Sequence, residues 1–307
     1  MFFLKICPLC NIKKKNLQKL VTSKVYGDKR NKTAFFHCFN CDARYQFPRL
    51  SKKEESVFYK KEFEKFMEKR SGKKSSWTKV ESHLTLNQET FERRNKYIKP
   101  YLKNVKSILE IGCSSGFMLY PMQKKGIKCV GIEPSGVFSK YVKKRGIEVF
   151  DDLNQLIKKH PKRKFDLITH FFVLEHISDP IYFFKQQIKL LNKGGKIIFE
   201  VPNVADPLHT IYNIKEFEEF YWQLAHHWYF SKKSLNFVLR KLETNYKILH
   251  DQRYDLSNHI IWARDRKPGG MKYFSNKLGE GIEIYYKNYL KKIGKCDTLI
   301  GVIEIGQ

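Results

Sequence analysis

The sequence predicts an α/β fold in which a doubly wound, mostly parallel sheet forms the larger part of the protein. Three observations predict it. Short apolar runs that suit buried parallel strands recur through the middle of the chain, and helical patterns separate them. The first run, 108–111, leads directly into a glycine-rich turn and a helix, as in nucleotide-binding βα units. Two Cys-x-x-Cys pairs precede this region and predict a small metal-stabilised module.

Length and composition agree with this plan. The chain has 307 residues, of which 42% are hydrophobic and 15% aromatic, so it can bury a core and is not a disordered polymer. The seven cysteines are an odd number, which argues against a secreted disulfide framework and favours a reducing compartment. No apolar run approaches the roughly 18 residues of a membrane span, and we find no signal peptide pattern. We therefore expect a cytoplasmic protein.

The net charge is strongly positive. There are 59 Lys and Arg residues against 31 Asp and Glu, a formal net charge of +28. Such a charge attracts nucleic acid, anionic membrane surfaces or phosphorylated substrates. The basic residues are scattered as short pairs along the whole chain, whereas a nucleic-acid footprint concentrates on one face. This scatter favours a solvated lysine-rich surface, with attraction of an anionic partner as the alternative.

The first element, 1–50, is predicted to be a zinc ribbon. Its four cysteines form two pairs, Cys7 with Cys10 and Cys38 with Cys41. Two intervening residues let one turn aim both thiolates at one metal, and two such turns complete a tetrahedral sulfur site that suits zinc. Short strands at 20–22 and 34–37 connect them. Because protein fills all four positions, the zinc is expected to be structural. The remaining cysteines, Cys113, Cys129 and Cys296, are expected to be ordinary buried residues.

Residues 51–95 are predicted to be a helical linker. Phe58, Phe63 and Phe66 recur at near-helical spacing and indicate an amphipathic helix. A second helix is expected at 87–101.

The glycine-rich turn that follows 108–111 has the spacing GxxxG, with Gly112 and Gly116. No Gly-Lys-Ser/Thr follows, which excludes a P-loop, and the spacing disfavours a dinucleotide turn. Glu133 ends the next strand, 21 positions after Gly112, where a carboxylate can accept hydrogen bonds from both ribose hydroxyls. Asp151 and Asp152 follow the third strand, where a carboxylate can accept from an adenine amino group. Further strands are expected at 165–170 and 196–201.

Four segments in this order, "ILEIGCSSGFML", "VGIEPS", "FDLITHFFVLEHISDP" and "LLNKGGKIIFEVPN", resemble the successive motifs of class I S-adenosylmethionine-dependent methyltransferases. The resemblance covers about residues 105 to 205. It implies a Rossmann-like seven-stranded sheet over 96–307, with S-adenosylmethionine as methyl donor.

The resemblance also implies the donor-binding residues. Glu110, Gly112 and Gly116 would hold the methionine part and Glu133 the ribose. Asp152 with Leu153, or Asp151, would meet the adenine, while His170 and Phe171 would line the donor. The full set is Glu110, Gly112, Ser114, Gly116, Phe117, Glu133, Pro134, Asp151, Asp152, Leu153, His170 and Phe171.

The cysteine module and the later segment "HHWYFSKKSL" are similar to bacterial sugar C-methyltransferases and surface-polysaccharide methyltransferases. This implies that His226 lies near the transferred methyl group, as a base or acceptor ligand, with His227 as a second catalytic candidate. A hydrogen-bonding or packing role for His226 is the alternative. The Tyr and Glu that precede this histidine in sugar C-methyltransferases are Gln223 and Ala225 here, which favours O-methylation.

In the class I plan the last two strands, 245–254 and 298–305, form a hairpin, so 255–296 is a long insertion. We expect 206–244 and 255–296 to build the acceptor site, with the arginines binding a phosphate-bearing acceptor. Dimer contact or a solvated loop is the alternative for the insertion. The predicted substrate-binding residues are Tyr229, Arg253, Asn258, His259 and Arg264.

Some class I enzymes bind a divalent ion with a Glu-His pair and an acid three residues before the Glu. The pair is present here as Glu175 and His176, but Phe172 occupies the earlier position. We therefore expect a hydrogen-bonded loop rather than a metal site.

The leading hypothesis is an O-methyltransferase acting on a nucleotide- or lipid-linked sugar in surface polysaccharide biosynthesis. Its acceptor would be a small molecule or glycan carrying negative charge, and the protein a monomer or homodimer. The alternatives are a sugar C-methyltransferase, and an RNA methyltransferase that uses the zinc module to bind RNA. The scattered charge and the missing Asn/Asp-Pro-Pro-Tyr/Phe motif disfavour RNA.

Overall fold

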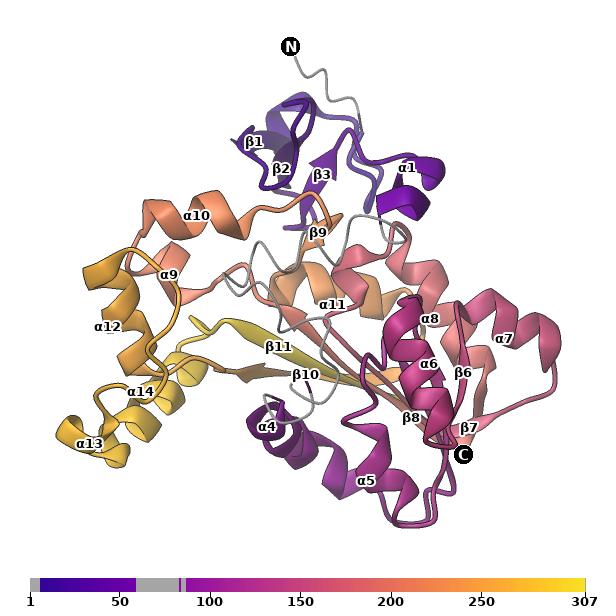
Figure 1. Ribbon diagram of the computed structural model, residues 1–307. Coiled ribbons are helices and arrows are strands. Elements are labelled where there is room, and N and C mark those ends of the chain that lie inside the picture. Colours follow the sequence, from indigo (N-terminus) through magenta and orange to yellow (C-terminus); the bar gives the residue numbers. More distant parts are fainter. Residues whose placement is uncertain (1–5, 59–82, 84–86, 307) are drawn as a thin grey trace.

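A computed structural model describes residues 6–58, 83 and 87–306 of the chain (Figure 1). Its larger sheet has seven strands in the order β10-β11-β8-β7-β4-β5-β6. The strands are β4 (Ser107–Ile111), β5 (Lys128–Ile132), β6 (Glu148–Phe150), β7 (Phe165–Phe171), β8 (Leu191–Pro202), β10 (Asn245–Asp251) and β11 (Thr298–Glu304). Only β11 runs antiparallel to its neighbours, β8 and β10. The predicted Rossmann-like seven-stranded sheet is confirmed.

Helices cover both faces of this sheet, because the strand residues alternate between two apolar clusters. On one face lie α4 (Gln88–Ile98), α5 (Leu119–Gln123) and α6 (Gly136–Lys144). On the other lie α7 (Leu153–Lys159), α8 (Pro180–Lys189) and α11 (Lys232–Arg240). Ile108 and Leu167 face α4, α5 and α6, while their neighbours Leu109 and Ile168 face α7, α8 and α11.

The sheet reverses its winding at β4. From β4 the chain continues to β5 on one side, and it later returns to β7 on the other side. In doubly wound sheets the crevice at the carboxyl ends of such neighbouring strands is where ligands bind. The turn 112–116 follows the carboxyl end of β4 and therefore lies at this point.

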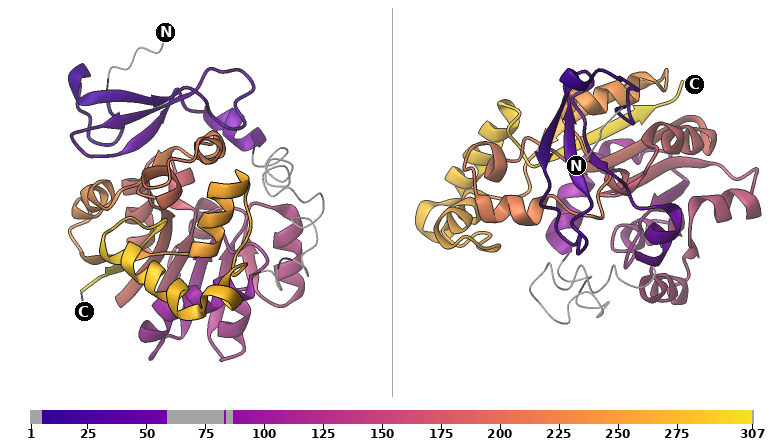
Figure 2. Two further views of the ribbon diagram at one scale, coloured as in Figure 1. Left: turned by 90° about the vertical axis from the view of Figure 1, so that its left-hand side faces the viewer. Right: turned by 90° about the horizontal axis from the view of Figure 1, so that it is seen from above.

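The N-terminal module forms a second sheet. It contains β1 (Gln18–Thr22), β2 (Ala34–Cys38) and β3 (Arg44–Phe47), preceded by η1 (Lys15–Leu17). The fourth strand, β9 (Trp228–Tyr229), comes from the larger unit and pairs with β3 in antiparallel register, Arg44 opposite Tyr229. The two predicted ribbon strands correspond to β1 and β2. The module thus docks on the core through main-chain hydrogen bonds as well as side chains. Figure 2 shows the indigo module beside the orange segments of the larger unit.

The predicted linker is described only in part. Helix α1 (Lys52–Val57) begins with a capping box between Ser51 and Glu54. Phe63 and Phe66 lie outside the described residues. Helix α4 continues through residues 95 and 96, where the sequence placed the start of the methyltransferase domain, and η3 (Lys99–Tyr101) follows it.

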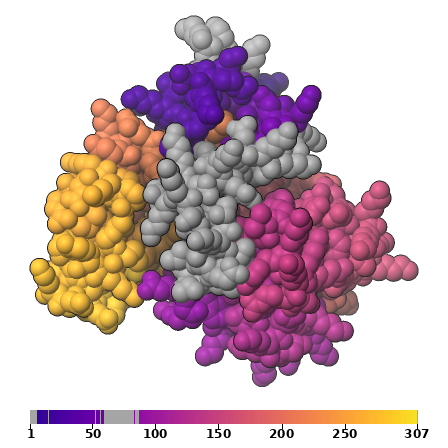
Figure 3. Space-filling model, in the orientation of Figure 1, coloured from indigo at the N-terminus to yellow at the C-terminus, as the bar shows by residue number. Residues whose placement is uncertain are grey.

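A third apolar cluster joins the ribbon to the elements that follow β8. These are α9 (Pro207–Thr210), α10 (Lys215–Tyr221) and α12 (Leu256–Asp265); the insertion continues with α13 (Ser275–Leu278) and α14 (Glu280–Lys292). Trp262 of α12 packs against Phe217 of α10 with ring centroids 5.4 Å apart. In Figure 3 the insertion forms the yellow lobe below the orange residues that contact the ribbon.

Within the described ranges, no helix combines the length and apolar character needed to cross a bilayer.

Candidate active site

The turn after β4 is shaped by two glycines with left-handed backbone angles. Gly112 has φ +74° and Gly116 has φ +76°, a region that favours glycine. A Cβ added at Gly112 would lie 2.7 Å from Cγ2 of Val173, so the chain after β7 presses directly on the turn. The amides of Gly112 and Cys113 both donate to the carbonyl of Ile132, which fixes the turn against β5.

Glu133 lies across from this turn at the end of β5. One of its carboxylate oxygens accepts from the Ser114 amide at 2.7 Å and the other from the Ser135 amide at 2.8 Å. A carboxylate oxygen accepts more than one hydrogen bond, so both oxygens keep capacity for ribose hydroxyls. Pro134 lies between Glu133 and Ser135. The sequence therefore anticipated the acid facing the turn, and the structure adds the two amides that orient it.

Glu110 precedes the turn and its side chain is buried. Burial raises the pKa of this carboxyl to about 8. The free protein therefore holds a protonated acid beneath the turn at neutral pH.

His83 is a site neighbour that the sequence did not reveal. Its Nδ1 lies 2.9 Å from the Ser115 hydroxyl, and its ring contacts those of Phe117 and Phe138. Burial lowers the pKa of His83 to about 4, so the ring is neutral. A single histidine within the predicted linker carries no pattern that would have placed it against the turn.

The two acids after β6 take different roles. The Asp152 carboxylate caps α7 by accepting from the Gln155 amide at 2.8 Å, while the Asp151 amide donates to the Gln155 side chain. Leu153 is buried at the start of the helix. Both acids stay candidates for meeting an adenine amino group, because the cap uses only one oxygen of the Asp152 carboxylate.

The prediction for His170 needs correction. Its side chain is fully buried, with ring centroids 5.2 Å from Phe199, 5.3 Å from Phe183 and 5.7 Å from Phe184. Strand alternation turns it toward α8, into the core, and burial lowers its pKa to about 3. We exclude this side chain from the proposed donor site. Phe171 points to the opposite face, where the Arg94 guanidinium lies 4.4 Å from its ring centre.

Three side chains of the kinds that can bind a metal lie close together beside the Gly112–Gly116 turn, which we call the donor turn. Glu175 and His176 belong to η4 (Leu174–His176), just after Val173, and His226 comes from the loop before β9. One donor atom from each of the three lies within 4.8 Å of the others. The sequence paired Glu175 with His176 and, by a separate argument, placed His226 near the transferred methyl group. It did not indicate that the three residues lie together.

His227 has different neighbours from His226. Its Nε2 lies 2.9 Å from a carboxylate oxygen of Glu55 in α1, and its carbonyl accepts from the Gln46 amide. Its own amide donates to the Glu175 carbonyl at 2.8 Å. These contacts give His227 the role of joining the ribbon to the core, and we leave it out of the proposed catalytic group.

Two predicted substrate-binding side chains have partners within the protein. The Tyr229 hydroxyl donates to the Tyr221 carbonyl and accepts from the Gln223 amide, and its ring lies within the third apolar cluster. Arg264 is exposed and forms a two-bond pair with Asp265, at 2.6 and 2.9 Å. Arg264 is therefore removed from the proposed acceptor site, whereas the Tyr229 ring lies 5.0 Å from that of His226 and stays beside it.

The other three lie in the interior of the insertion or beside it. Arg253 stacks on Phe172, with the guanidinium 4.5 Å from the ring centre. The Asn258 side chain donates to the Gly269 carbonyl at 2.5 Å. Nδ1 of His259 shares a 2.5 Å hydrogen bond with the Tyr286 hydroxyl, and burial lowers the pKa of His259 to about 3. Of these, Arg253 lies nearest the segment that follows β7.

The four cysteines of the ribbon fit a tetrahedral metal. Sγ of Cys7 lies 3.7 Å from that of Cys41, and Sγ of Cys10 lies 3.6 Å from that of Cys38. Four sulfurs at the zinc–sulfur distance of about 2.3 Å would be roughly 3.8 Å apart. The donor set and its spacing therefore match zinc.

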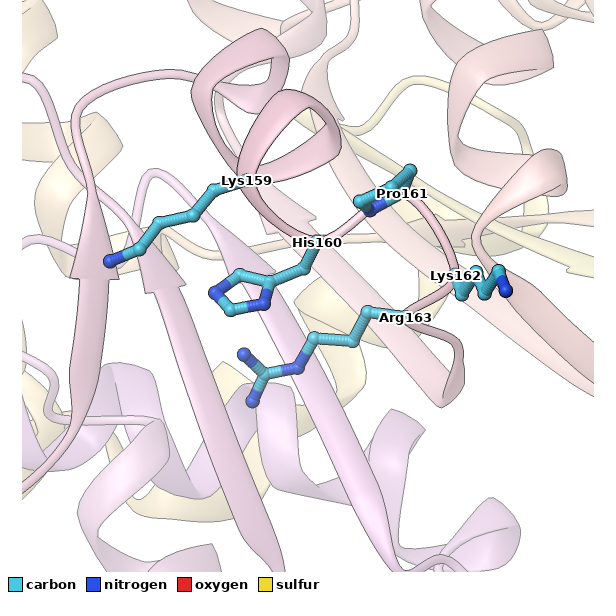
Figure 4. A pocket seen from close by; sticks show the side chains of 5 residues that line it. All are labelled: Lys159, His160, Pro161, Lys162 and Arg163. Carbon is cyan, nitrogen blue, oxygen red and sulfur yellow. The ribbon is translucent and has the colours of Figure 1, made fainter.

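A surface pocket lies between α7 and β7. It is lined by Lys159, His160, Pro161, Lys162 and Arg163, which precede β7 (Figure 4). His160 and Arg163 both pair with Glu148 of β6, at the edge of the sheet. Because β4 and β7 are parallel, this pocket is at the opposite end of the strands from the Gly112 turn.

Comparison with known proteins agrees with this arrangement. The profile of a family described as "Methyltransferase domain" matches residues 84–250, more than half of the chain. The chain belongs to this family. With its seven-stranded sheet, it is a class I S-adenosylmethionine-dependent methyltransferase domain preceded by a cysteine module.

Individual methyltransferases are similar over shorter stretches. A ubiquinone biosynthesis O-methyltransferase of Pelagibacter ubique (strain HTCC1062) is 35% identical over 98 residues, 31% of this chain and 40% of the relative. A tRNA U34 carboxymethyltransferase of Sulfurovum sp. (strain NBC37-1) is 34% identical over 103 residues, 31% of this chain and 34% of the relative. The chain thus spans less than half the length of these curated relatives.

Solved methyltransferase structures are similar at low identity. A SAM-dependent methyltransferase from Archaeoglobus fulgidus has a TM-score of 0.48 and 19% identity, over 70% of this chain and 93% of that chain. The plantazolicin methyltransferase BamL, in complex with a triazolic desmethylPZN analog and SAH, has a TM-score of 0.49 and 16% identity, over 82% and 95% respectively.

Proposed function

We propose that this methyltransferase domain binds S-adenosylmethionine and O-methylates a sugar, nucleotide- or lipid-linked, in surface polysaccharide biosynthesis. The observation that carries the methyl-donor part is Glu133, held by two backbone amides across the Gly112–Gly116 turn at the point where the sheet reverses its winding. The bound donor supplies a methyl group already activated on a sulfonium.

The protein's own residues then have distinct tasks. Gly112 and Gly116 let the backbone approach the methionine part, and Glu133 accepts from the ribose hydroxyls. Asp152 with Leu153, or Asp151, is assigned to the adenine. On the acceptor side, His226 is assigned as base or acceptor ligand. Aligning the two reactants supplies much of the rate, because holding them in place removes the entropy cost of their encounter.

The donor assignment is tested by calorimetry with S-adenosylhomocysteine. The wild-type protein is expected to bind, and Glu133→Gln to bind roughly 10- to 100-fold more weakly, because hydrogen bonds to a charged acceptor contribute about 1.5–3 kcal/mol. Glu148→Gln is the matched control, since Glu148 also lies on the parallel sheet but pairs with Arg163 at its edge. An absence of binding by the wild-type chain would refute the assignment.

The sugar acceptor is supported by the resemblance of the cysteine module and of residues 226–235 to sugar and polysaccharide methyltransferases. O-methylation is supported by Gln223 and Ala225 and by the ubiquinone biosynthesis O-methyltransferase among the relatives. A donor-consumption screen against sugar nucleotides, glycans and RNA tests both, and uptake of the methyl group at carbon would identify a C-methyltransferase instead. The cytoplasmic location and a monomeric or homodimeric state stay predictions.

RNA methylation is the second candidate. The observations that favour it are the net charge of +28 and the similarity to a tRNA U34 carboxymethyltransferase. In that case the ribbon would serve as the RNA-binding arm.

For the ribbon we propose one structural zinc ion bound by Cys7, Cys10, Cys38 and Cys41. Elemental analysis of the purified protein should find zinc that is lost when Cys38 and Cys41 are replaced by serine.

A further inference from the structure

We propose that Glu175, His176 and His226 bind a divalent metal ion beside the donor turn, and that the ion receives the hydroxyl group of the acceptor. The proposal rests on the proposed function for its second half and on side-chain geometry for its first. A carboxylate and two imidazoles are a donor set used by catalytic zinc and non-haem iron sites. Three protein ligands leave positions at the ion to which an acceptor oxygen can bind.

The spacing suits one ion. The three donor atoms lie within 4.8 Å of one another. At metal–ligand distances of about 2.1 Å, neighbouring ligands of an octahedral ion are about 3 Å apart and opposite ligands about 4.2 Å. Small side-chain rotations therefore bring all three onto one centre. Glu175 and His226 are buried, which shields the ion from bulk water.

The histidine tautomer also suits a metal ligand. Nδ1 of His176 lies 2.8 Å from the carbonyl of Ala225, which can only accept, so Nδ1 carries the proton. The lone pair of His176 is therefore on Nε2. Metal-ligating histidines commonly donate their other ring N–H to a backbone carbonyl in this way, which fixes the ring.

Backbone contacts hold the two ligand-bearing segments together. Besides the His176–Ala225 bond, the His227 amide donates to the Glu175 carbonyl at 2.8 Å. The Trp228 indole donates to the Ile177 carbonyl, also at 2.8 Å. These three hydrogen bonds join residues 175–177 to residues 225–228, and the rings of His176 and His226 meet edge to face with centroids 4.7 Å apart. The three side chains are thus held near one another before any ion binds.

The proposed ion site is close to the turn that is assigned to the methyl donor. Val173 packs on Gly112 of the donor turn, and Glu175 and His176 follow two and three residues later. A cation here stabilises an ionised oxygen, so the acceptor hydroxyl loses its proton to solvent at lower pH than it would in water. With the ion bound, His226 serves as its ligand and not as the base. The oxygen then forms a bond to the methyl carbon as the carbon–sulfur bond breaks, and that electron pair stays on sulfur.

The test uses Mn²⁺, which prefers oxygen and nitrogen ligands and so avoids the four cysteines. Titration of the full-length protein, followed by the electron paramagnetic resonance signal of unbound Mn²⁺, should reveal one site per chain. Glu175→Gln and His226→Gln should each weaken it by at least about tenfold. His160→Gln is the matched control, because His160 also lies beside a glutamate, 3.4 Å from Glu148, and belongs to the segment that precedes β7 and not to the one that follows it.

Thermal melting and zinc content confirm that each variant is folded. The proposal is overturned if the wild-type protein binds no Mn²⁺ at millimolar concentration, or if the two variants bind it as tightly as wild type. Calorimetry with S-adenosylhomocysteine on the same samples reports on the proposed function separately. Mn²⁺ binding without homocysteine-product binding would keep the ion site and refute the methyltransferase activity, and the reverse result would do the opposite.

Discussion

Glu110 is a buried acid whose charge should depend on the donor. Burial raises its pKa to about 8, so at pH 7 roughly nine-tenths of the free protein carries the protonated form. The methionine part of the proposed donor brings an ammonium group and a sulfonium, and nearby positive charge favours the carboxylate. Donor binding at pH 7 should therefore release up to about one proton.

The release is measured from the binding enthalpy in buffers of different ionisation enthalpy. Because the donor binds the ionised form better, affinity should rise with pH up to about 8 and then level off, and proton release should vanish above about pH 9. Glu110→Gln should bind with no buffer dependence. An enthalpy independent of buffer in the wild-type protein would show that Glu110 does not sense the donor.

Single residues were predictable from sequence where a strand end fixes their position. Glu133 terminates a strand beside the glycine turn, and the sheet necessarily brings the two together. The position of His170 was not predictable in this way, because a one-residue step along β7 changes the face of the sheet on which a side chain lies. For the adenine the sequence left Asp152 with Leu153, or Asp151, and the structure adds that one oxygen of Asp152 caps α7, as an aspartate at the start of a helix commonly does.

At the scale of elements, the ribbon holds the loop that carries His226. The side-chain amide of Gln46 donates to the Leu224 carbonyl at 2.9 Å, and the backbone amide of Gln46 donates to the His227 carbonyl at 3.0 Å. Both bonds flank His226. The sequence predicted the ribbon from its cysteines but not this docking, because β9 is only two residues long and pairs with a strand almost two hundred positions away.

Gln46→Ala should loosen this loop without disturbing the donor turn. Losing one buried hydrogen bond costs about 1 kcal/mol, which lowers the melting temperature by roughly 2–4 °C. Hydrogen exchange of residues 223–229 should accelerate, while affinity for S-adenosylhomocysteine stays within about twofold. Gln186→Ala is the control, because Gln186 of α8 donates to the Asn154 side chain of α7 at the exposed surface. Equal exchange in the two variants would contradict a role of the ribbon in ordering the loop.

Helix α4 is attached to the sheet by ion pairs that the sequence pattern did not predict. Its helical range was predicted, but its attachment to the sheet was not. The Arg94 side chain bonds the buried Glu200 of β8 at 2.7 Å, and Arg93 bonds both Glu200 and Asp251 of β10. Burial opposes ionisation of Glu200, but the two arginines outweigh it and hold its pKa below the usual range. Such pairs connect distant segments, so no periodicity along the chain signals them.

At the scale of the whole molecule, the class I sheet was predictable because four motifs occur in order, whereas the role of the charge was not. The ribbon would be the RNA-binding arm of the second candidate function, yet its arginines have partners within the protein. Arg44 pairs with Asp42 at 2.8 Å, and Arg30 pairs with Glu54 at 2.9 Å. Arg49 donates to the Ser178 carbonyl and lies 4.1 Å from the Trp228 ring centre. These contacts favour docking of the ribbon over phosphate binding.

RNA binding is therefore expected to be non-specific. A positively charged surface that releases counterions binds any polyanion, with affinity falling linearly in a plot of log affinity against log salt concentration. Fluorescence anisotropy should give dissociation constants of about 10⁻⁴ to 10⁻⁶ M near 0.15 M salt, equal for a folded tRNA and a scrambled strand of the same length. If the tRNA bound about a thousandfold more tightly than the scrambled strand, the charge would be serving recognition, and RNA would replace the sugar as the proposed acceptor.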